Sequence, residues 1–131
     1  MTTVPEGLWN RALESLEAAK AVLPVSPNAA ASRAYYAAFY AVSAALALQG
    51  RFFRKHSAVD SAVHRDFVRS GLWPKELGEA YSRLLELRTT GDYGQVENVA
   101  PEDARGAIEK AAAILRTVAQ AHLTDFQIDK G

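Results

Sequence analysis

Residues 27–49 of the chain read PNAAASRAYYAAFYAVSAALALQ, and this stretch decides the fold. Ten alanines lie between Ala29 and Ala47, and Arg33 is the only charged residue. A helix that is apolar on nearly every side has to be covered on several sides by other elements. Because alanine side chains let neighbouring helices approach closely, we expect this helix at the centre of a bundle. Ser26 is well placed to cap its first turn.

The rest of the chain also shows helical periodicity, with apolar residues recurring at three- and four-residue steps. Thr3 and Glu6 are spaced as a capping box for the first helix, and Pro101 suits the first turn of the last one. We therefore expect an all-α fold, a single compact bundle of about five helices. The expected ranges are about 5–23, 27–49, 56–70, 74–88 and 101–121, with a loop over 89–99.

Length and composition indicate one globular domain. The chain has 131 residues, of which 49% are hydrophobic and 23% are charged, as in an ordinary packed protein. We expect the domain to span residues 1–131, with its core over about 5–121 and a frayed tail over 122–131. Fifteen Lys and Arg balance fifteen Asp and Glu. This balance argues against a protein held to nucleic acid or membrane by bulk charge.

The sequence contains neither cysteine nor a recognisable targeting segment. Without cysteine, a disulfide scaffold, a thiol nucleophile and a Cys-based metal centre are excluded. Residues 1–6 lack the basic and apolar regions of a signal peptide. The uncharged run from Ala34 to Gly50 is too short and too rich in alanine to predict a membrane span. We therefore expect a cytoplasmic protein without a membrane segment.

Residues 87–94, with the sequence LRTTGDYG, form the richest cluster of functional side chains. Arg88 has a planar, permanently charged donor fork that suits phosphate, and Asp92 and Tyr93 follow about one helical turn later. The glycines beside them allow a ligand to approach the backbone. The alternative is an Arg–Asp pair that only closes the end of the helix, with Tyr93 packed on the bundle. Spacing alone favours this alternative.

A second cluster lies on the alanine-rich helix. Tyr36 and Tyr40 share a face, and Tyr36 lies three residues from Arg33. Aromatic residues on such a helix usually belong to the core, so we expect Tyr35 and Phe39 to pack. Arg33 differs from them, because a buried arginine needs an acidic partner or a ligand phosphate.

Two further patterns lie between residues 51 and 69. His56, Asp60 and His64 recur every four residues, and two histidines with an aspartate could hold a metal. Surface His–Asp pairs are far commoner and no His-Glu-x-x-His motif is present, so we expect no metal site and rank a metal-dependent hydrolase third among the functions. The same stretch has five Lys and Arg against two Asp, with interleaved phenylalanines. It could be a nucleic-acid surface or simply a solvated helical face.

Three blocks of the chain resemble, in order, the HEPN family of nucleotide-binding domains. They are 32–40 (SRAYYAAFY), 55–59 (KHSAV) and 84–93 (LLELRTTGDY). The likeness is to a small bacterial and archaeal branch whose last block reads Arg, three residues, Asp-Tyr, and it covers about residues 8–121. The middle block is the weakest, since relatives usually show Thr-His followed by Ser-Gly or Lys-Gly.

The resemblance implies an up-and-down four-helix core, commonly in a homodimer, and no cofactor. Many HEPN proteins are metal-independent endoribonucleases that use an arginine followed, after four to six residues, by a histidine. Small ones often pair with a minimal nucleotidyltransferase in toxin–antitoxin operons. Arg88 matches the arginine, but Tyr93 stands at the histidine position, and a tyrosine with a pKa of about 10 is a poor general base. Arg51 and His56 also have the required spacing, which we interpret as coincidence because they precede the third helix.

We therefore expect a HEPN-type protein of a toxin–antitoxin or defence system that binds RNA or nucleotide. If it is an endoribonuclease, its expected catalytic residues are Arg88, Tyr93 and Asp92. The expected nucleotide- or RNA-binding residues are Arg33, Tyr36 and His56. The alternative is a non-catalytic interaction module that binds a minimal nucleotidyltransferase, which the zero net charge and the missing histidine favour.

Overall fold

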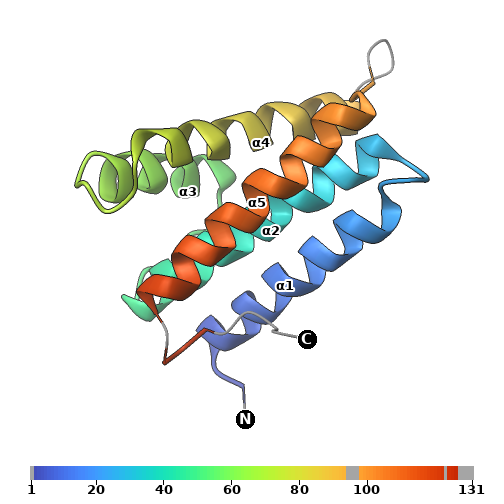
Figure 1. Cartoon of the computed structure of the whole chain (residues 1–131). Helices are drawn as coiled ribbons and strands as arrows, with labels where there is room; N and C mark the ends of the chain where they lie inside the picture. The colour runs from blue at the N-terminus through green and yellow to red at the C-terminus, as the bar shows by residue number, and fades with distance from the viewer. Residues whose placement is uncertain (1, 94–97, 123, 127–131) are drawn as a thin grey trace.

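The computed structural model describes residues 2–93, 98–122 and 124–126, and every regular element in these residues is a helix. The elements are α1 (Val4–Val22), α2 (Pro27–Leu48), α3 (His56–Ala62), the π-helix η1 (Val63–Val68), α4 (Lys75–Tyr93) and α5 (Pro101–Ala121). α1, α2, α4 and α5 run alternately up and down, and α3 lies beside α4 at one end (Figure 1). The expected all-α bundle is confirmed. In the described part of the chain, none of the helices has both the length and the hydropathy to cross a membrane.

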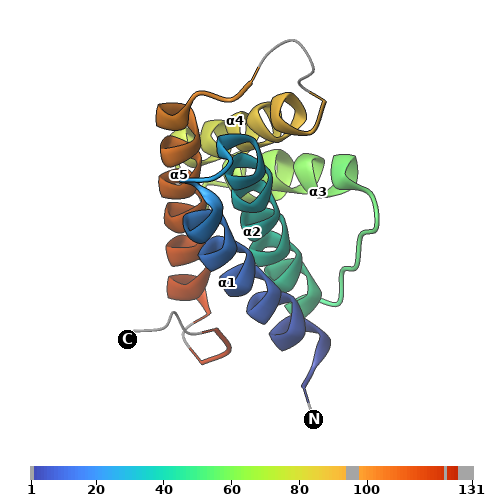
Figure 2. The same cartoon turned by 90° about the vertical axis from the view of Figure 1, so that its right-hand side faces the viewer.

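α2 is the central helix, as its composition predicts. It contacts α1, α3, α4 and α5, and Figure 2 shows it between α5 and α3 with α1 alongside. Ala34, Ala37 and Ala41 are fully buried, so the neighbouring helices approach the backbone of α2 closely. The hydroxyl of Ser26 accepts a hydrogen bond from the Ala29 N–H at 3.1 Å, which confirms the expected cap.

The third helix differs from the single α-helix expected over 56–70. After α3 the chain continues as η1, whose wider turns lie against α4. Gly78 of α4 makes this approach possible, because a Cβ at this position would lie only 2.6 Å from Cγ2 of Val68. The apolar spacing of residues 59, 63 and 67 fits both helix types, so it could not distinguish them.

α4 is longer than expected, and the prediction of a loop over 89–99 is wrong for its first five residues. The hydroxyls of Thr89 and Thr90 donate hydrogen bonds to backbone carbonyls one turn earlier, at 2.9 Å and 3.2 Å. Gly91 packs against the backbone of Asn28 at the start of α2. This tertiary contact offsets the low helix propensity of threonine and glycine. Residues 94–97 lie outside the described residues.

The chain after α5 returns to α1. Phe126 is only 1% exposed, and its ring stacks on Trp9 with a centroid distance of 4.9 Å. The expectation of a frayed tail over 122–131 therefore does not hold at Phe126. Residues 123 and 127–131 of that tail lie outside the described residues.

Candidate functional site

Arg88 lies near the end of α4 and contacts two tyrosines of α2. Its Nη2 donates a hydrogen bond to the Tyr36 hydroxyl at 3.1 Å. Its Nε lies 2.8 Å from Oδ2 of Asp92, as an ion pair without hydrogen-bond geometry. The guanidinium carbon stands 5.4 Å from the ring centroid of Tyr36 and 5.6 Å from that of Tyr35. The predicted Arg–Asp pair is present, and two aromatic faces fix the plane of the arginine.

The Arg88 guanidinium keeps part of its donor capacity unused. Burial lowers its pKa, but Tyr36 and Asp92 raise it, and the net pKa lies above the ordinary value for arginine. The side chain is 21% exposed. Among the residues that the structure describes, Nη1 has no hydrogen-bond partner. This edge of the fork can therefore receive an anion from solvent.

His56, the first residue of α3, joins the same cluster from another part of the chain. Its Nδ1 lies 2.7 Å from the hydroxyl of Tyr35, and its ring stacks on Phe39 with a centroid distance of 4.3 Å. The ring also meets Tyr36 edge-on at 5.7 Å. Burial and the charge of Arg88 lower the pKa of His56 below 6.5. The imidazole is therefore neutral at pH 7 and shares both tyrosines with Arg88.

Tyr35 has a polar role that the sequence did not reveal. We expected Tyr35 and Phe39 only to pack, but the Tyr35 hydroxyl bonds His56, which is 21 residues away in the chain. Burial raises the pKa of Tyr35 to about 12, so the hydroxyl keeps its proton at neutral pH. The only signal in the sequence was that both residues belong to blocks with a family resemblance.

Arg33 lies on the surface, so the prediction that it is a buried arginine in need of a partner is wrong. It lines a hollow of about 400 Å³ between the start of α2 and the end of α4. Asp92, the ion-pair partner of Arg88, lines the same hollow. Arg33 has no carboxylate partner among the described residues. Asp92 thus pairs with Arg88 and shares a hollow with Arg33.

Tyr93 is the last residue of α4 and is 73% exposed. The alternative in which it packs on the bundle is therefore wrong, although the Arg88–Asp92 part of that alternative is present. Gly91 also differs from expectation, because a Cβ there would lie 2.7 Å from the carbonyl oxygen of Asn28. Gly91 thus allows helix packing rather than ligand approach, and Gly94 lies outside the described residues.

The expected stripe of His56, Asp60 and His64 does not form one cluster. His64 Nε2 lies 3.5 Å from Asp60 and 3.0 Å from the Ser82 hydroxyl, whereas His56 bonds Tyr35. Within residues 2–93, 98–122 and 124–126, no group of three His, Asp or Glu side chains is placed to hold a metal ion.

The basic stretch of residues 51–69 is partly neutralised. Asp66 lies 2.9 Å from Arg65 and 2.6 Å from Arg51, and these two arginines lower its pKa to about 2. Arg51 is therefore engaged in a structural pair and does not contact His56. This arrangement supports the interpretation of the Arg51–His56 spacing as coincidence.

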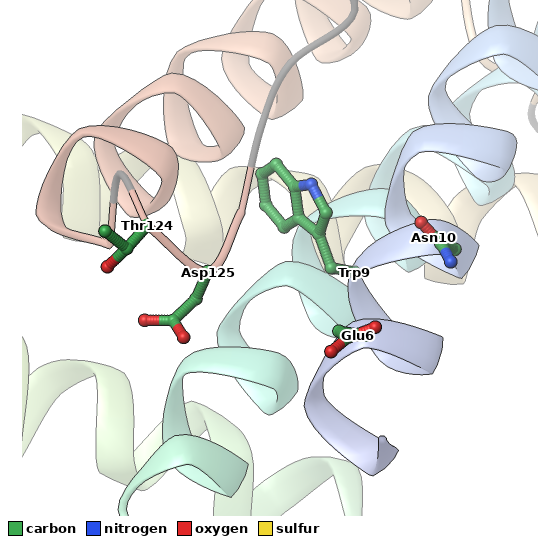
Figure 3. Close-up of a pocket in the computed structure, with 5 residues that line it drawn as sticks. All are labelled: Glu6, Trp9, Asn10, Thr124 and Asp125. Carbon is green, nitrogen blue, oxygen red and sulfur yellow. The ribbon is translucent and has the colours of Figure 1, made fainter. Parts of the chain in front are cut away.

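A second hollow, of about 360 Å³, lies where the end of the described chain meets α1. Figure 3 shows Trp9 of α1 pointing toward the segment that carries Thr124 and Asp125. The charged side chains in its lining are the carboxylates of Glu6 and Asp125. Because both are negative, this hollow disfavours phosphate, and the candidate site remains at Arg88.

Comparison with known proteins places these residues in context. A family model described as HEPN domain matches residues 5–121. A UPF0332 protein of Thermotoga maritima is 43% identical over 112 residues, which cover 84% of this chain and 85% of the relative. A protein of Methanocaldococcus jannaschii described as a putative toxin is 30% identical over 116 residues, or 82% of this chain and 79% of the relative. The crystal structure of TT1696 from Thermus thermophilus has the same fold, with a TM-score of 0.74 at 20% identity over 91% of this chain and 98% of that one.

Proposed function

The chain belongs to the HEPN domain family, and on this premise we propose that it is a toxin-like protein that binds RNA and cleaves it without a metal ion. The observation that supports the proposal is that Arg88 and His56 share the rings of Tyr35 and Tyr36. A planar arginine suits an RNA phosphate, and a neutral imidazole suits the proton of a ribose 2′-hydroxyl. The similarity to a relative described as a toxin supports the biological setting.

Arg88 is the phosphate ligand in this proposal. Tyr36 and Asp92 hold the Arg88 guanidinium in place, so the Arg88 side chain loses little conformational entropy when the phosphate binds. Arg33 adds a second cation at the adjoining hollow. The exposed hydroxyl of Tyr93 can donate a hydrogen bond to a phosphate oxygen, a role that does not require it to act as a base.

His56 takes the place of the histidine that is missing at position 93. This role requires the tautomer with the ring proton on Nδ1, in which Nδ1 donates to the Tyr35 oxygen and the lone pair of Nε2 is free. Nε2 takes the proton of the 2′-hydroxyl while the 2′ oxygen forms a bond to phosphorus. The bond from phosphorus to the 5′ oxygen breaks, and the leaving oxygen takes a proton from solvent. The products are a 2′,3′-cyclic phosphate and a 5′-hydroxyl.

Binding of single-stranded RNA tests the first half of this proposal. We expect Arg88→Gln to weaken binding by about tenfold or more, because a charged hydrogen-bond donor is lost. Arg83→Gln is the matched control, since it removes the same charge from a 44% exposed side chain of the same helix. Equal affinities of wild type and Arg88→Gln would contradict the assignment of the phosphate site.

The alternative function is a non-catalytic module that holds a minimal nucleotidyltransferase. The observation that favours it is that a tyrosine, Tyr93, stands at the family's histidine position and is exposed. Co-elution of the purified protein with such a nucleotidyltransferase, together with intact RNA after incubation, would favour this alternative. Cleavage of RNA by the isolated chain would exclude it as the sole function.

A further inference from the structure

A second arginine–tyrosine pair adjoins the Arg88 site. The guanidinium carbon of Arg11, on α1, stands 5.3 Å from the ring centroid of Tyr40 on α2. The Tyr40 ring centroid lies 6.0 Å from that of Tyr36, whose hydroxyl accepts the hydrogen bond from Arg88. Tyr36 and Tyr40 are four residues apart and lie on the same face of α2. The four side chains therefore form one continuous row across three helices.

The charge of Arg11 is not neutralised within the described residues. Arg11 is exposed, and no carboxylate of the described chain lies within ion-pair distance of it. Arg51 and Arg65, by contrast, both pair with Asp66. An aromatic ring holds a guanidinium in place without cancelling its charge. Arg11 thus resembles Arg88 in being oriented by tyrosine and available to an anion.

We propose that Arg11 and Tyr40 form a second nucleotide subsite, which holds the nucleotide next to the one bound at Arg88. The proposal rests on the proposed RNA-binding function. Proteins that bind single-stranded RNA combine cations that follow the backbone with flat side chains on which bases stack. A guanidinium suits both roles, because its edge carries N–H donors for a phosphate and its plane stacks with a base. The ligand class is single-stranded RNA longer than a mononucleotide.

The test compares two probe lengths on the full chain. The probes are a fluorescein-labelled uridine mononucleotide and a fluorescein-labelled uridine hexanucleotide. Both carry 2′-O-methyl groups, so the protein cannot cleave them. We expect Arg11→Gln to weaken binding of the hexanucleotide by about five- to tenfold and to lower its salt slope by about 0.7, with no change for the mononucleotide. Arg116→Gln, at an exposed position of α5 outside the row, is the matched control and should bind as wild type does.

The other possible results distinguish failure of the second subsite from failure of the proposed RNA-binding function. Unchanged hexanucleotide affinity in Arg11→Gln, with a loss in Arg88→Gln, overturns the second subsite and leaves the proposed function in place. An equal loss in Arg11→Gln and Arg116→Gln shows a nonspecific charge effect and also overturns it. A change in molecular mass of Arg11→Gln in light scattering would place Arg11 in a protein interface instead. Absence of binding by the wild type and by Arg88→Gln alike overturns the proposed function and the subsite together.

Discussion

The rings of Tyr35 and Tyr36 lie beside a permanent cation, Arg88, and beside the imidazole of His56, whose pKa is lowered by burial and by that cation. Protonation of His56 would place a second positive charge in the same half-buried cluster. The aromatic rings exclude water, which makes the repulsion stronger than it would be in solvent. The neutral imidazole that the proposed proton transfer requires is therefore a property of the fold.

The titration of His56 tests this arrangement. We expect its NMR titration midpoint below 6.5, because burial and the charge of Arg88 both lower the pKa. Arg88→Gln should move the midpoint upward toward 6.5, since one of the two causes is removed. Arg83→Gln, at a 44% exposed side chain of the same helix, should leave it unchanged. A midpoint above 6.5 in the wild type would contradict the described environment.

The same shift makes stability depend on pH. Because the pKa of His56 is lower in the folded chain, the unfolded chain takes up the proton first as the pH falls. The contribution of neutral His56 to stability is therefore complete above about pH 6.5 and decreases as the pH falls from there through the folded pKa. Urea unfolding at several pH values should show a smaller decrease in His56→Gln than in the wild type. An identical decrease in both would count against the shift.

The sequence predicted the contacts of some site residues but not of others. Arg88 and Asp92 are one turn apart on one helix, so their pairing follows from helix geometry. The contact between His56 and Tyr35 depends on how α3 packs against α2, which no local spacing encodes. The exposure of Arg33 likewise depends on which side of α2 its neighbours cover.

At the scale of elements, one glycine lets the end of α4 approach the start of α2 closely. A Cβ at Gly91 would lie 2.7 Å from the backbone oxygen of Asn28, and a backbone atom cannot move aside cheaply. Gly91→Ala should therefore lower the free energy of unfolding by about 1–2 kcal/mol, despite the better helix propensity of alanine. Thermal or urea unfolding measures this change.

Gly106→Ala on α5 is the control for Gly91→Ala. The nearest atom to a Cβ at Gly106 is the flexible end of Lys110, at 3.7 Å. This substitution should raise stability by about 0.5–1 kcal/mol through helix propensity alone. A similar gain for Gly91→Ala would show that the two helices do not meet as closely as described.

The segment after α5 should contribute to the core through Phe126. Removing a buried aromatic ring typically costs about 3 kcal/mol or more, so Phe126→Ala should destabilise the fold by about that amount and change the fluorescence of Trp9. Phe52→Ala is the control, because Phe52 is 64% exposed and its loss should stay within about 0.5 kcal/mol. Equal effects of the two substitutions would contradict the described packing.

The sequence predicted the helix boundaries correctly where local hydrogen bonds determine them. The hydroxyls of Thr3 and Ser26 cap α1 and α2 as their positions predict. The end of α4 and the change from α3 to η1 did not follow, because both depend on contacts between helices, at Gly91 and at Gly78. Helix propensity is a weak local preference that such packing overrides.

At the scale of the whole molecule, we predict that the protein acts as a homodimer, as the family resemblance implies. Light scattering should then give twice the chain mass of 14.2 kDa. Arg88→Gln should not change this mass, because the substitution removes a ligand contact and leaves the fold intact. A monomer at concentrations where RNA is bound would contradict the predicted homodimer.

Because the net charge of the chain is zero, RNA binding has to come from locally placed cations. Arg88 pairs with Asp92, which shares a hollow with Arg33. His56 contacts the same two tyrosines as Arg88. The acidic hollow at Glu6 and Asp125 is a distinct region that disfavours phosphate. The distribution of charge on the bundle is thus the feature that relates the fold to the proposed function.

The most direct test is an RNA cleavage assay in EDTA with wild type, Arg88→Ala, His56→Gln and the control His64→Gln. We predict that the wild type and His64→Gln cleave single-stranded RNA and leave 2′,3′-cyclic phosphate ends. Arg88→Ala and His56→Gln should each be slower by about a hundredfold or more, as expected for the loss of a phosphate ligand or of a proton-transfer group. Intact RNA with the wild type, or cleavage by His56→Gln at the wild-type rate, would contradict a ribonuclease site built on Arg88 and His56.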